Sequence, residues 1–168
     1  MKLGALEAGG TKMVCAIGDE KGKIYEQVSI PTESPEETIP QLLAFFQDKE
    51  IEALGIASFG PVELDEAAPD YGCITTTNKA KWRNYNIRNA FLEGLHCPVG
   101  FDTDVNGSVL GEVTFGQAKG KNCVLYLTIG CRTDFADIQN KKECGGNRQW
   151  QNHYLRNWAA NTKGKGII

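Results

Sequence analysis

The feature that most constrains this chain is the segment Glu-Ala-Gly-Gly-Thr-Lys at residues 7–12, between two short apolar runs. The runs, at residues 3–6 and 13–17, predict two strands that meet at a glycine-rich turn. Because Gly9 and Gly10 carry no side chains, positive φ angles are accessible and successive backbone N–H groups can surround an anionic oxygen. The segment therefore indicates phosphate chemistry. An ordinary hairpin, for which Gly-Gly is a standard loop, is the alternative.

Three side chains of the segment suit the same chemistry. Thr11 offers a hydroxyl, Lys12 an ammonium and Glu7 a carboxylate. Together these groups fit a phosphate and its magnesium ion.

Length and composition predict one globular domain, with 168 residues of which 41% are hydrophobic and 23% charged. The formal net charge is −3 and Lys and Arg are scattered, so nucleic acid is not an expected partner. The chain lacks the run of about eighteen apolar residues that a membrane helix needs. A polar turn stands where a signal peptide has its apolar core, so no membrane is expected and a cytoplasmic location is the default.

The six cysteines fit no zinc or disulfide framework. Cys15 and Cys123 lie in apolar runs and are expected to act as small hydrophobic residues. A metal site from Cys131, Cys144 and His153 would have unusual ligand spacing, so no metal ligand is assigned.

Hydrophobic patterning predicts an α/β fold with a mixed sheet. Strands at 3–8, 13–18 and 24–30 form an antiparallel meander, and the helices and strands that follow form βαβ crossovers. These later elements are a helix opened by Ser34, Pro35 and Glu37, a strand at 51–58, a helix capped by Asn84, a strand at 98–101, a helix at 107–115 and a strand at 122–129.

Candidate ligand-binding residues follow the ends of two of these strands. Gly60 and Pro61 form a turn of a kind that contacts ligands in open α/β sheets, although a plain strand terminator is equally open. Asp104 lies between a strand and a helix, where it can take the proton of a hydroxyl whose oxygen attacks phosphorus. A helix cap is the alternative for Asp104. Glu112 falls two helical turns later and either faces the same cleft or is solvated.

Lys79 and Trp82 form a further candidate site in a loop. A sugar presents hydroxyls to a charged group and C–H faces to an aromatic ring, so the two side chains can clamp one. A surface lysine beside a packing tryptophan is the alternative.

Taken together, the motifs closely resemble the ROK family of sugar kinases, and within it the bacterial fructokinases. The resemblance runs from about residue 3 to residue 130. It is carried, in order, by residues 7–12, Ser58-Phe59-Gly60-Pro61, Thr75-Thr76-Thr77-Asn78-Lys79 with Trp82, and Thr103-Asp104-Val105-Asn106 with Gly111-Glu112.

The resemblance implies an actin-like, RNase-H-like ATPase fold with two such domains, of which this chain matches the first. It implies ATP and Mg²⁺ as cofactors, fructose as the sugar and fructose 6-phosphate as the product, with a homodimer open for the intact family form. By position it implies a phosphate loop at Gly9, Gly10, Thr11 and Lys12, magnesium placement by Glu7, a catalytic base at Asp104, and sugar-side positions at Gly60, Pro61, Lys79, Asn106 and Glu112.

The chain departs from the family after Gly130. Cys131-Arg132-Thr133-Asp134-Phe135 stands where the family has a second glycine-rich phosphate loop, and its larger side chains would keep the backbone from a nucleotide. The family's Glu-Gly-His sugar motif, its zinc motif and its second domain have no counterpart. We therefore expect a kinase domain at 1–130, an aberrant tail at 131–168, exposed apolar surface and little kinase activity.

Two other functions stay open. One is a non-enzymatic sugar-binding or regulatory fragment, although repressors of this family begin with a helix-turn-helix domain for which a phosphate turn at residue 7 leaves no room. The other is a kinase for another hexose or an acetylated amino sugar. Asn78, where the fructokinases have proline, weakens the case for fructose slightly.

The abrupt break inside a motif predicts that a frameshift or a gene-model error replaced the natural continuation. Sequencing the locus around the codon for Gly130 is expected to show a shifted frame. An intact frame that encodes residues 131–168 would contradict this prediction.

Overall fold

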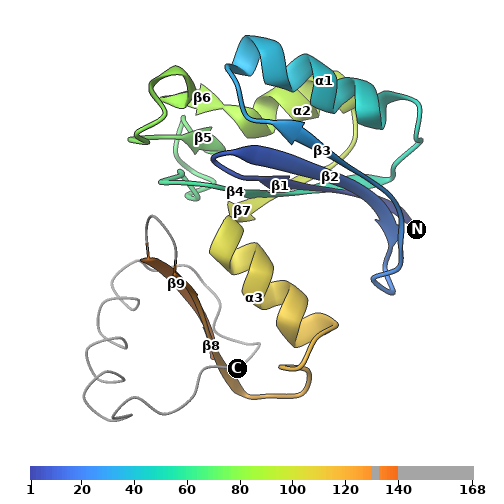
Figure 1. Ribbon diagram of the computed structural model, residues 1–168, viewed down its shortest axis with the longest axis vertical. Coiled ribbons are helices and arrows are strands. Elements are labelled where there is room, and N and C mark those ends of the chain that lie inside the picture. Colours follow the sequence, from blue (N-terminus) through green and yellow to red (C-terminus); the bar gives the residue numbers. More distant parts are fainter. Residues whose placement is uncertain (130–132, 140–168) are drawn as a thin grey trace. The chain divides into compact units, whose positions relative to one another are not determined.

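A five-stranded mixed sheet organises residues 1–107, the first of two compact units in the computed structural model (Figure 1). The structure describes residues 1–129 and 133–139. The strand order is β3-β2-β1-β4-β7, with β1 at Lys2–Ala8, β2 at Lys12–Asp19, β3 at Ile24–Pro31, β4 at Ala53–Ser58 and β7 at Val99–Thr103.

The pairing of these strands confirms the predicted meander and crossovers. β1, β2 and β3 pair antiparallel in sequence order, whereas β4 runs parallel to β1 and β7 runs parallel to β4. Alternation along β1 buries Leu6 and Ala8 on one face and leaves Glu7 exposed on the other. The two faces of the sheet are therefore distinct along β1, one buried in the core and one more exposed.

Helix α1 at Pro35–Gln47 begins where the sequence predicts it. The backbone nitrogen of Ser34 donates to Glu37 Oε2 at 3.2 Å, and Ser34 Oγ donates to the same oxygen at 2.8 Å. Both hydrogen bonds lower the pKa of the exposed Glu37 carboxyl, and the one from the Ser34 side chain has the larger effect. Pro35 takes a first-turn position, and Pro40 lies inside the helix.

Helix α2 at Ile87–Leu95 begins later than predicted, and its cap is Asn86 rather than Asn84. The side chain of Asn86 accepts from the backbone nitrogen of Asn89 at 2.9 Å. Strand β6 at Tyr85–Asn86 pairs with β5 at Cys73–Ile74, so the chain is still extended there. Asn84 instead turns the chain with φ of 57° in the left-handed region, which asparagine tolerates.

One face of the sheet packs against α1 and α2 to form the core. Leu6, Met13, Leu42 and Phe91 are at most 1% exposed. A Cβ on Gly4 would lie 2.8 Å from Ile51 Cδ1, so glycine lets the side chains beyond β1 approach closely. Glu7 lies on the opposite face of the sheet from this core.

The cysteine predictions have different outcomes. Cys15 is buried, and burial raises the pKa of its thiol to about 12, as expected for a small core residue. Cys123 is exposed, so the prediction that it acts as a small hydrophobic residue, as Cys15 does, is wrong. An apolar run predicts burial only when both sides of its strand are covered, and Cys123 is the first residue of its strand.

The second unit contains β8 at Cys123–Ile129 and β9 at Thr133–Gln139, which pair antiparallel. β8 matches the predicted strand. β9 lies in the predicted tail and was not predicted, because Phe135 and Ile138 are three residues apart and lack the alternation of a strand. No helix in the described ranges is long and apolar enough to cross a membrane.

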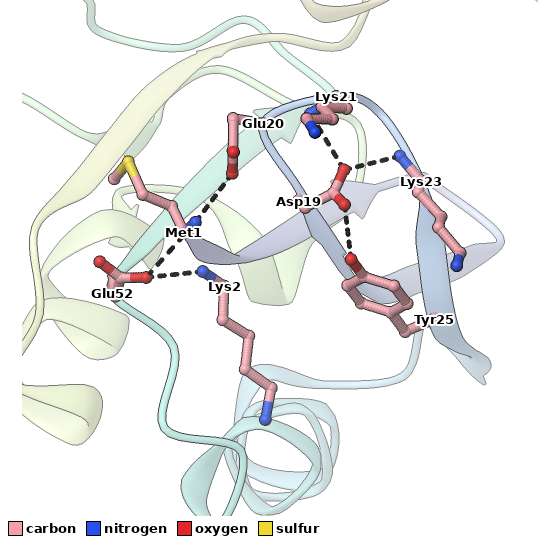
Figure 2. A network of polar contacts seen from close by, with 8 residues as sticks. All are labelled: Met1, Lys2, Asp19, Glu20, Lys21, Lys23, Tyr25 and Glu52. Carbon is pink, nitrogen blue, oxygen red and sulfur yellow. Dashed lines mark hydrogen bonds and ion pairs between the residues drawn. The ribbon is translucent and has the colours of Figure 1, made fainter.

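Charged residues tie together the strand ends at the opposite end of β1 from the glycine turn (Figure 2). Asp19 accepts from the backbone nitrogens of Lys21 and Lys23 and from the hydroxyl of Tyr25. The N-terminal ammonium of Met1 lies 2.8 Å from Glu20 Oε2. These groups are exposed, so their interactions contribute little to the stability of the fold.

Candidate active site

The C-terminal ends of β1, β4 and β7 form one edge of the sheet. In register, Ala8 pairs with Ser58 and Ser58 pairs with Thr103, so the three strands end together. The backbone nitrogen of Phe59 donates to the carbonyl of Ala8 at 2.8 Å and continues the ladder past the strands. Neighbouring strands lie about 4.8 Å apart, so the three following segments lie within roughly 10 Å. The predicted turn after Ala8, the Gly60 turn and Asp104 are therefore brought to one edge.

The glycine turn is a tight hairpin held from the side. The backbone nitrogen of Gly9 donates to the carbonyl of Lys12 at 3.1 Å. Thr32, at the end of β3, donates through Oγ1 to the carbonyl of Gly9 at 2.7 Å and through its backbone nitrogen to the carbonyl of Thr11 at 3.0 Å. Thr32 is 8% exposed, so these bonds are shielded from water. The hairpin and phosphate-turn interpretations are thus compatible.

The reason for glycine at this turn differs from the predicted one. Neither Gly9 nor Gly10 has φ in the left-handed region. A Cβ on Gly9 would instead lie 2.5 Å from the carbonyl oxygen of Lys12. Close backbone approach therefore requires Gly9, while the side chains of Thr11 and Lys12 are exposed toward any ligand.

The exposed side chain of Glu7 lies on the face of the sheet opposite the buried Leu6 and Ala8, in a row with a second carboxylate. Glu7 pairs in register with Ala57, and Ala57 pairs with Asp102. The small side chain of Ala57 thus separates the two acids. No group of three metal-ligating side chains occurs among the described residues. A magnesium ion here would need phosphate oxygens and water beside Glu7, and the water-mediated role of Glu7 stays a prediction.

Asp104 is the first residue of α3, which spans Asp104–Thr114 and begins earlier than the predicted residue 107. Thr103 Oγ1 accepts from the backbone nitrogen of Asn106 at 3.1 Å, as an N-cap side chain does. Asp104 Oδ1 accepts from the backbone nitrogen of Val105 at 2.9 Å. The cap role suggested for Asp104 therefore falls mainly to Thr103, and Asp104 is half-buried at the sheet edge.

The side chain of Asn106 is oriented by Asp102. Asn106 Nδ2 donates to Asp102 Oδ1 at 2.6 Å, and the backbone nitrogen of Thr103 donates to the same oxygen at 2.7 Å. A carboxylate only accepts hydrogen bonds at neutral pH, so the amide nitrogen of Asn106 faces it and the amide oxygen faces away.

Helix α3 passes close over the sheet at its start. A Cβ on Gly107 would lie 2.6 Å from Ala57 Cβ. This close approach keeps the first turn of α3 next to the row of Glu7 and Asp102, so Gly107 is a supporting residue of the edge.

The turn after β4 connects the edge to the loop that carries Lys79. The peptide bond between Gly60 and Pro61 is cis. The carbonyl of Pro61 accepts from the backbone nitrogen of Thr75 at 2.7 Å and from Thr75 Oγ1 at 3.1 Å. The loop from Thr75 is therefore fixed to the same edge.

Trp82 does not take part in a ligand clamp, so that prediction is wrong and the packing alternative is correct. Trp82 is 1% exposed, and its indole Nε1 donates to the carbonyl of Glu33 at 2.8 Å. Its ring meets those of Phe59 and Tyr85 edge-on. Lys79 is only half-buried, and its Cε is 3.5 Å from where a Cβ on Gly10 would be.

Glu112 lies in the second unit, where its Oε2 accepts from the backbone nitrogen of Gln117 at 3.1 Å. Its place near a sugar stays a prediction. Gly130, Cys131 and Arg132, at the predicted break in a second phosphate loop, lie outside the described residues, as does the rejected metal set of Cys131, Cys144 and His153.

Sequence reasoning missed two supporting residues of this edge, Thr32 and Gly107. Thr32 contacts a residue 23 positions away, and no local pattern signals that contact. Gly107 follows Asn106 directly, but its close approach to Ala57 depends on how α3 crosses the sheet.

Comparisons with known proteins agree with this architecture. The profile of the ROK family matches residues 3–153, which extends past residue 130. Fructokinase from Pediococcus pentosaceus is 42% identical over 130 residues, covering 77% of this chain and 45% of the relative. Fructokinase from Lactococcus lactis subsp. cremoris is 40% identical over 143 residues, covering 85% of this chain and 48% of the relative. The chain spans about half the length of the curated relatives it matches.

A solved structure shows the same fold. The ROK family glucokinase from Streptomyces griseus, in complex with glucose and AMPPNP, superposes with a TM-score of 0.74 at 22% identity. The match covers 88% of this chain and 47% of the glucokinase. The expected actin-like fold is thereby confirmed.

The turn geometry predicts opposite outcomes for the two neighbouring glycines. Gly9→Ala should lower the free energy of unfolding by about 1–3 kcal/mol, because its Cβ meets a backbone carbonyl that cannot move freely. Gly10→Ala should change it by less than about 1 kcal/mol, since its Cβ meets only the end of a flexible side chain. Urea unfolding of both variants checks this, and equal losses would contradict the assignment of close approach to Gly9.

Proposed function

The chain belongs to the ROK family, and from this premise we propose that it carries the phosphate turn and the catalytic base of a kinase that phosphorylates fructose with ATP. The observation that carries the proposal is the meeting of three segments at one sheet edge: the turn after Ala8, the Gly60 turn and Asp104. The identity of 40–42% to fructokinases supports fructose as the sugar.

The turn at residues 9–12 fits a phosphate group. Close approach at Gly9 brings backbone groups together, and the exposed Thr11 and Lys12 add a hydroxyl and an ammonium. Glu7 supplies a carboxylate on the adjoining sheet face for a hydrated magnesium ion. When bound, MgATP supplies the phosphoryl group and neutralises part of its charge.

On the sugar side, Asp104 acts as the general base. It accepts the proton of the C6 hydroxyl of fructose as that oxygen attacks the γ-phosphorus of ATP, while the bond from phosphorus to the β–γ bridging oxygen breaks and ADP is the leaving group. The proton stays on the Asp104 carboxylate until product leaves. The edge position at the start of α3 places Asp104 two strands from the phosphate turn. Such catalysis depends on positioning and electrostatics, which rigid strand ends supply.

The remaining proposed contacts surround the sugar. Asn106 presents its amide oxygen away from Asp102, so it can accept from a sugar hydroxyl. Gly60 and Pro61 lie at the neighbouring strand end, and Glu112 completes the sugar-side set carried over from the family resemblance. Lys79, which the resemblance also assigns to the sugar side, has its side chain beside the glycine turn, and a phosphate group is the ligand proposed for it. The proposal includes a kinase domain at 1–130, a tail at 131–168, a cytoplasmic location and, in the intact form, dimerisation.

We expect the 168-residue chain to bind fructose. Its kcat should lie well below roughly 1 s⁻¹, which is the lower end of the range typical of enzymes. The reason is the lost second phosphate loop, without which ATP is held from one side only. Calorimetry with fructose measures binding. Turnover is measured in the presence of ATP and magnesium with an assay that couples the formation of fructose 6-phosphate to a change in the colour of a dye. Glucose and an N-acetylated amino sugar serve as controls.

The outcomes separate the candidate functions. Fructose binding with little turnover fits the proposal, whereas turnover at an ordinary rate would contradict the loss of activity. Stronger binding of glucose or the amino sugar would contradict fructose as the substrate. No binding of any sugar would contradict the proposed function itself.

A further inference from the structure

The side chain of Lys79 passes beside the glycine turn. We propose that Lys79 is a phosphate-binding residue, forming with Lys12 a pair of ammonium groups that hold the anionic oxygens of the transferred phosphoryl group. The contact that carries this proposal is between the two loops: Lys79 Cε is 3.5 Å from the Cβ position of Gly10. The proposal deepens the proposed function and rests on it.

The backbone of Lys79 is held rigidly, so the point from which its side chain extends is a property of the fold. Its nitrogen donates to Thr77 Oγ1 at 3.3 Å, and its carbonyl accepts from the backbone nitrogen of Trp82 at 2.9 Å. Thr77 and Trp82 are each 1% exposed. Arg83 Nε adds a bond to the carbonyl of Thr77 at 2.6 Å. Because the backbone of Lys79 is already fixed, little backbone freedom is lost when Lys79 binds an anion.

The turn that faces Lys79 is equally fixed. Gly9 is bonded to Lys12 and to the buried Thr32, so Gly10 is held between two supported residues. The turn and the Lys79 loop thus meet with a glycine on one and a lysine side chain on the other. Glycine leaves space for a ligand atom beside the lysine, and the backbone of the turn adds its own donors.

A second lysine two residues away behaves differently. Lys81 is exposed on the 3₁₀ turn at Ala80–Trp82 and faces the acidic start of α1. After the hydrogen bonds from Ser34, the positive charge of Lys81 contributes to the lowered pKa of Glu37. Both lysines line the pocket formed with Thr32, Glu33 and Ser34, but Lys79 lies against the glycine turn and is half-buried whereas Lys81 is exposed. Lys81 therefore provides a matched control.

The charge balance at the turn favours an anion over a neutral sugar. Across residues 1–129 and 133–139, neither Lys12 nor Lys79 takes part in an ion pair. Lysine binds phosphate as a point charge, and hydrogen bonds to charged groups are stronger than those to neutral hydroxyls. The two unpaired ammonium groups at one glycine turn are best satisfied by phosphate oxygens.

Titration of the full chain with inorganic tripolyphosphate tests the proposal. Lys79→Met should weaken tripolyphosphate binding on the order of ten-fold, the loss of one charge-assisted hydrogen bond. Lys79→Arg should retain most of the affinity, and Lys81→Met should match the unsubstituted chain. Fructose affinity should be unchanged in all three variants, and thermal melts of each should coincide with that of the unsubstituted chain.

Several results would overturn the proposal. If Lys79→Met weakens fructose binding and leaves tripolyphosphate binding intact, Lys79 is a sugar residue and the proposed function still holds. Equal losses in Lys79→Met and Lys81→Met would indicate general attraction of the anion. A chain that binds fructose but not tripolyphosphate would refute the role of Lys79 alone. A chain that binds neither would refute the proposed function as well.

Discussion

The parallel alignment of β1, β4 and β7 is the constraint on which the site depends. Parallel strands point their carboxyl ends to the same edge, and the register makes Ala8, Ser58 and Thr103 end in one row. The hydrogen bond from the backbone nitrogen of Phe59 to the carbonyl of Ala8 joins the segment after β4 to the end of β1, just beyond the strands. Residues far apart in the chain are thus brought together by the backbone, before any side chain contributes.

Rigid support from buried residues distinguishes this edge from an ordinary end of a sheet. Thr32 braces the glycine turn from β3, and Trp82 anchors the Lys79 loop in the core. Asp102 orients the amide of Asn106, and Gly107 lets α3 start close over Ala57. Phosphoryl transfer needs little covalent chemistry from the protein, so positioning of this kind is what the fold has to provide.

The sequence predicts the features that local signals encode. Alternation and turn residues give the three meander strands, and Ser34, Pro35 and Glu37 give the start of α1. Features set by distant contacts are not predicted. Burial of Trp82 depends on Glu33 and on two other rings, and the cap at Asn86 depends on pairing of Tyr85 with Ile74. Glycine is needed at residue 9 because a Cβ there would meet the carbonyl oxygen of Lys12, three residues later. The sequence alone suggested a different reason, a positive φ angle.

The most direct measurement uses residues 1–130 of this chain joined to the second half of the Pediococcus pentosaceus fructokinase. This chimera should phosphorylate fructose, and Asp104→Asn within it should lower kcat by roughly 10²–10⁴-fold with little change in the KM for fructose, because a general base acts in the transition state. Asp65→Asn, in the exposed loop after β4, should leave kcat unchanged. Full turnover by the Asp104→Asn chimera would contradict phosphoryl transfer at this sheet edge with Asp104 as the base.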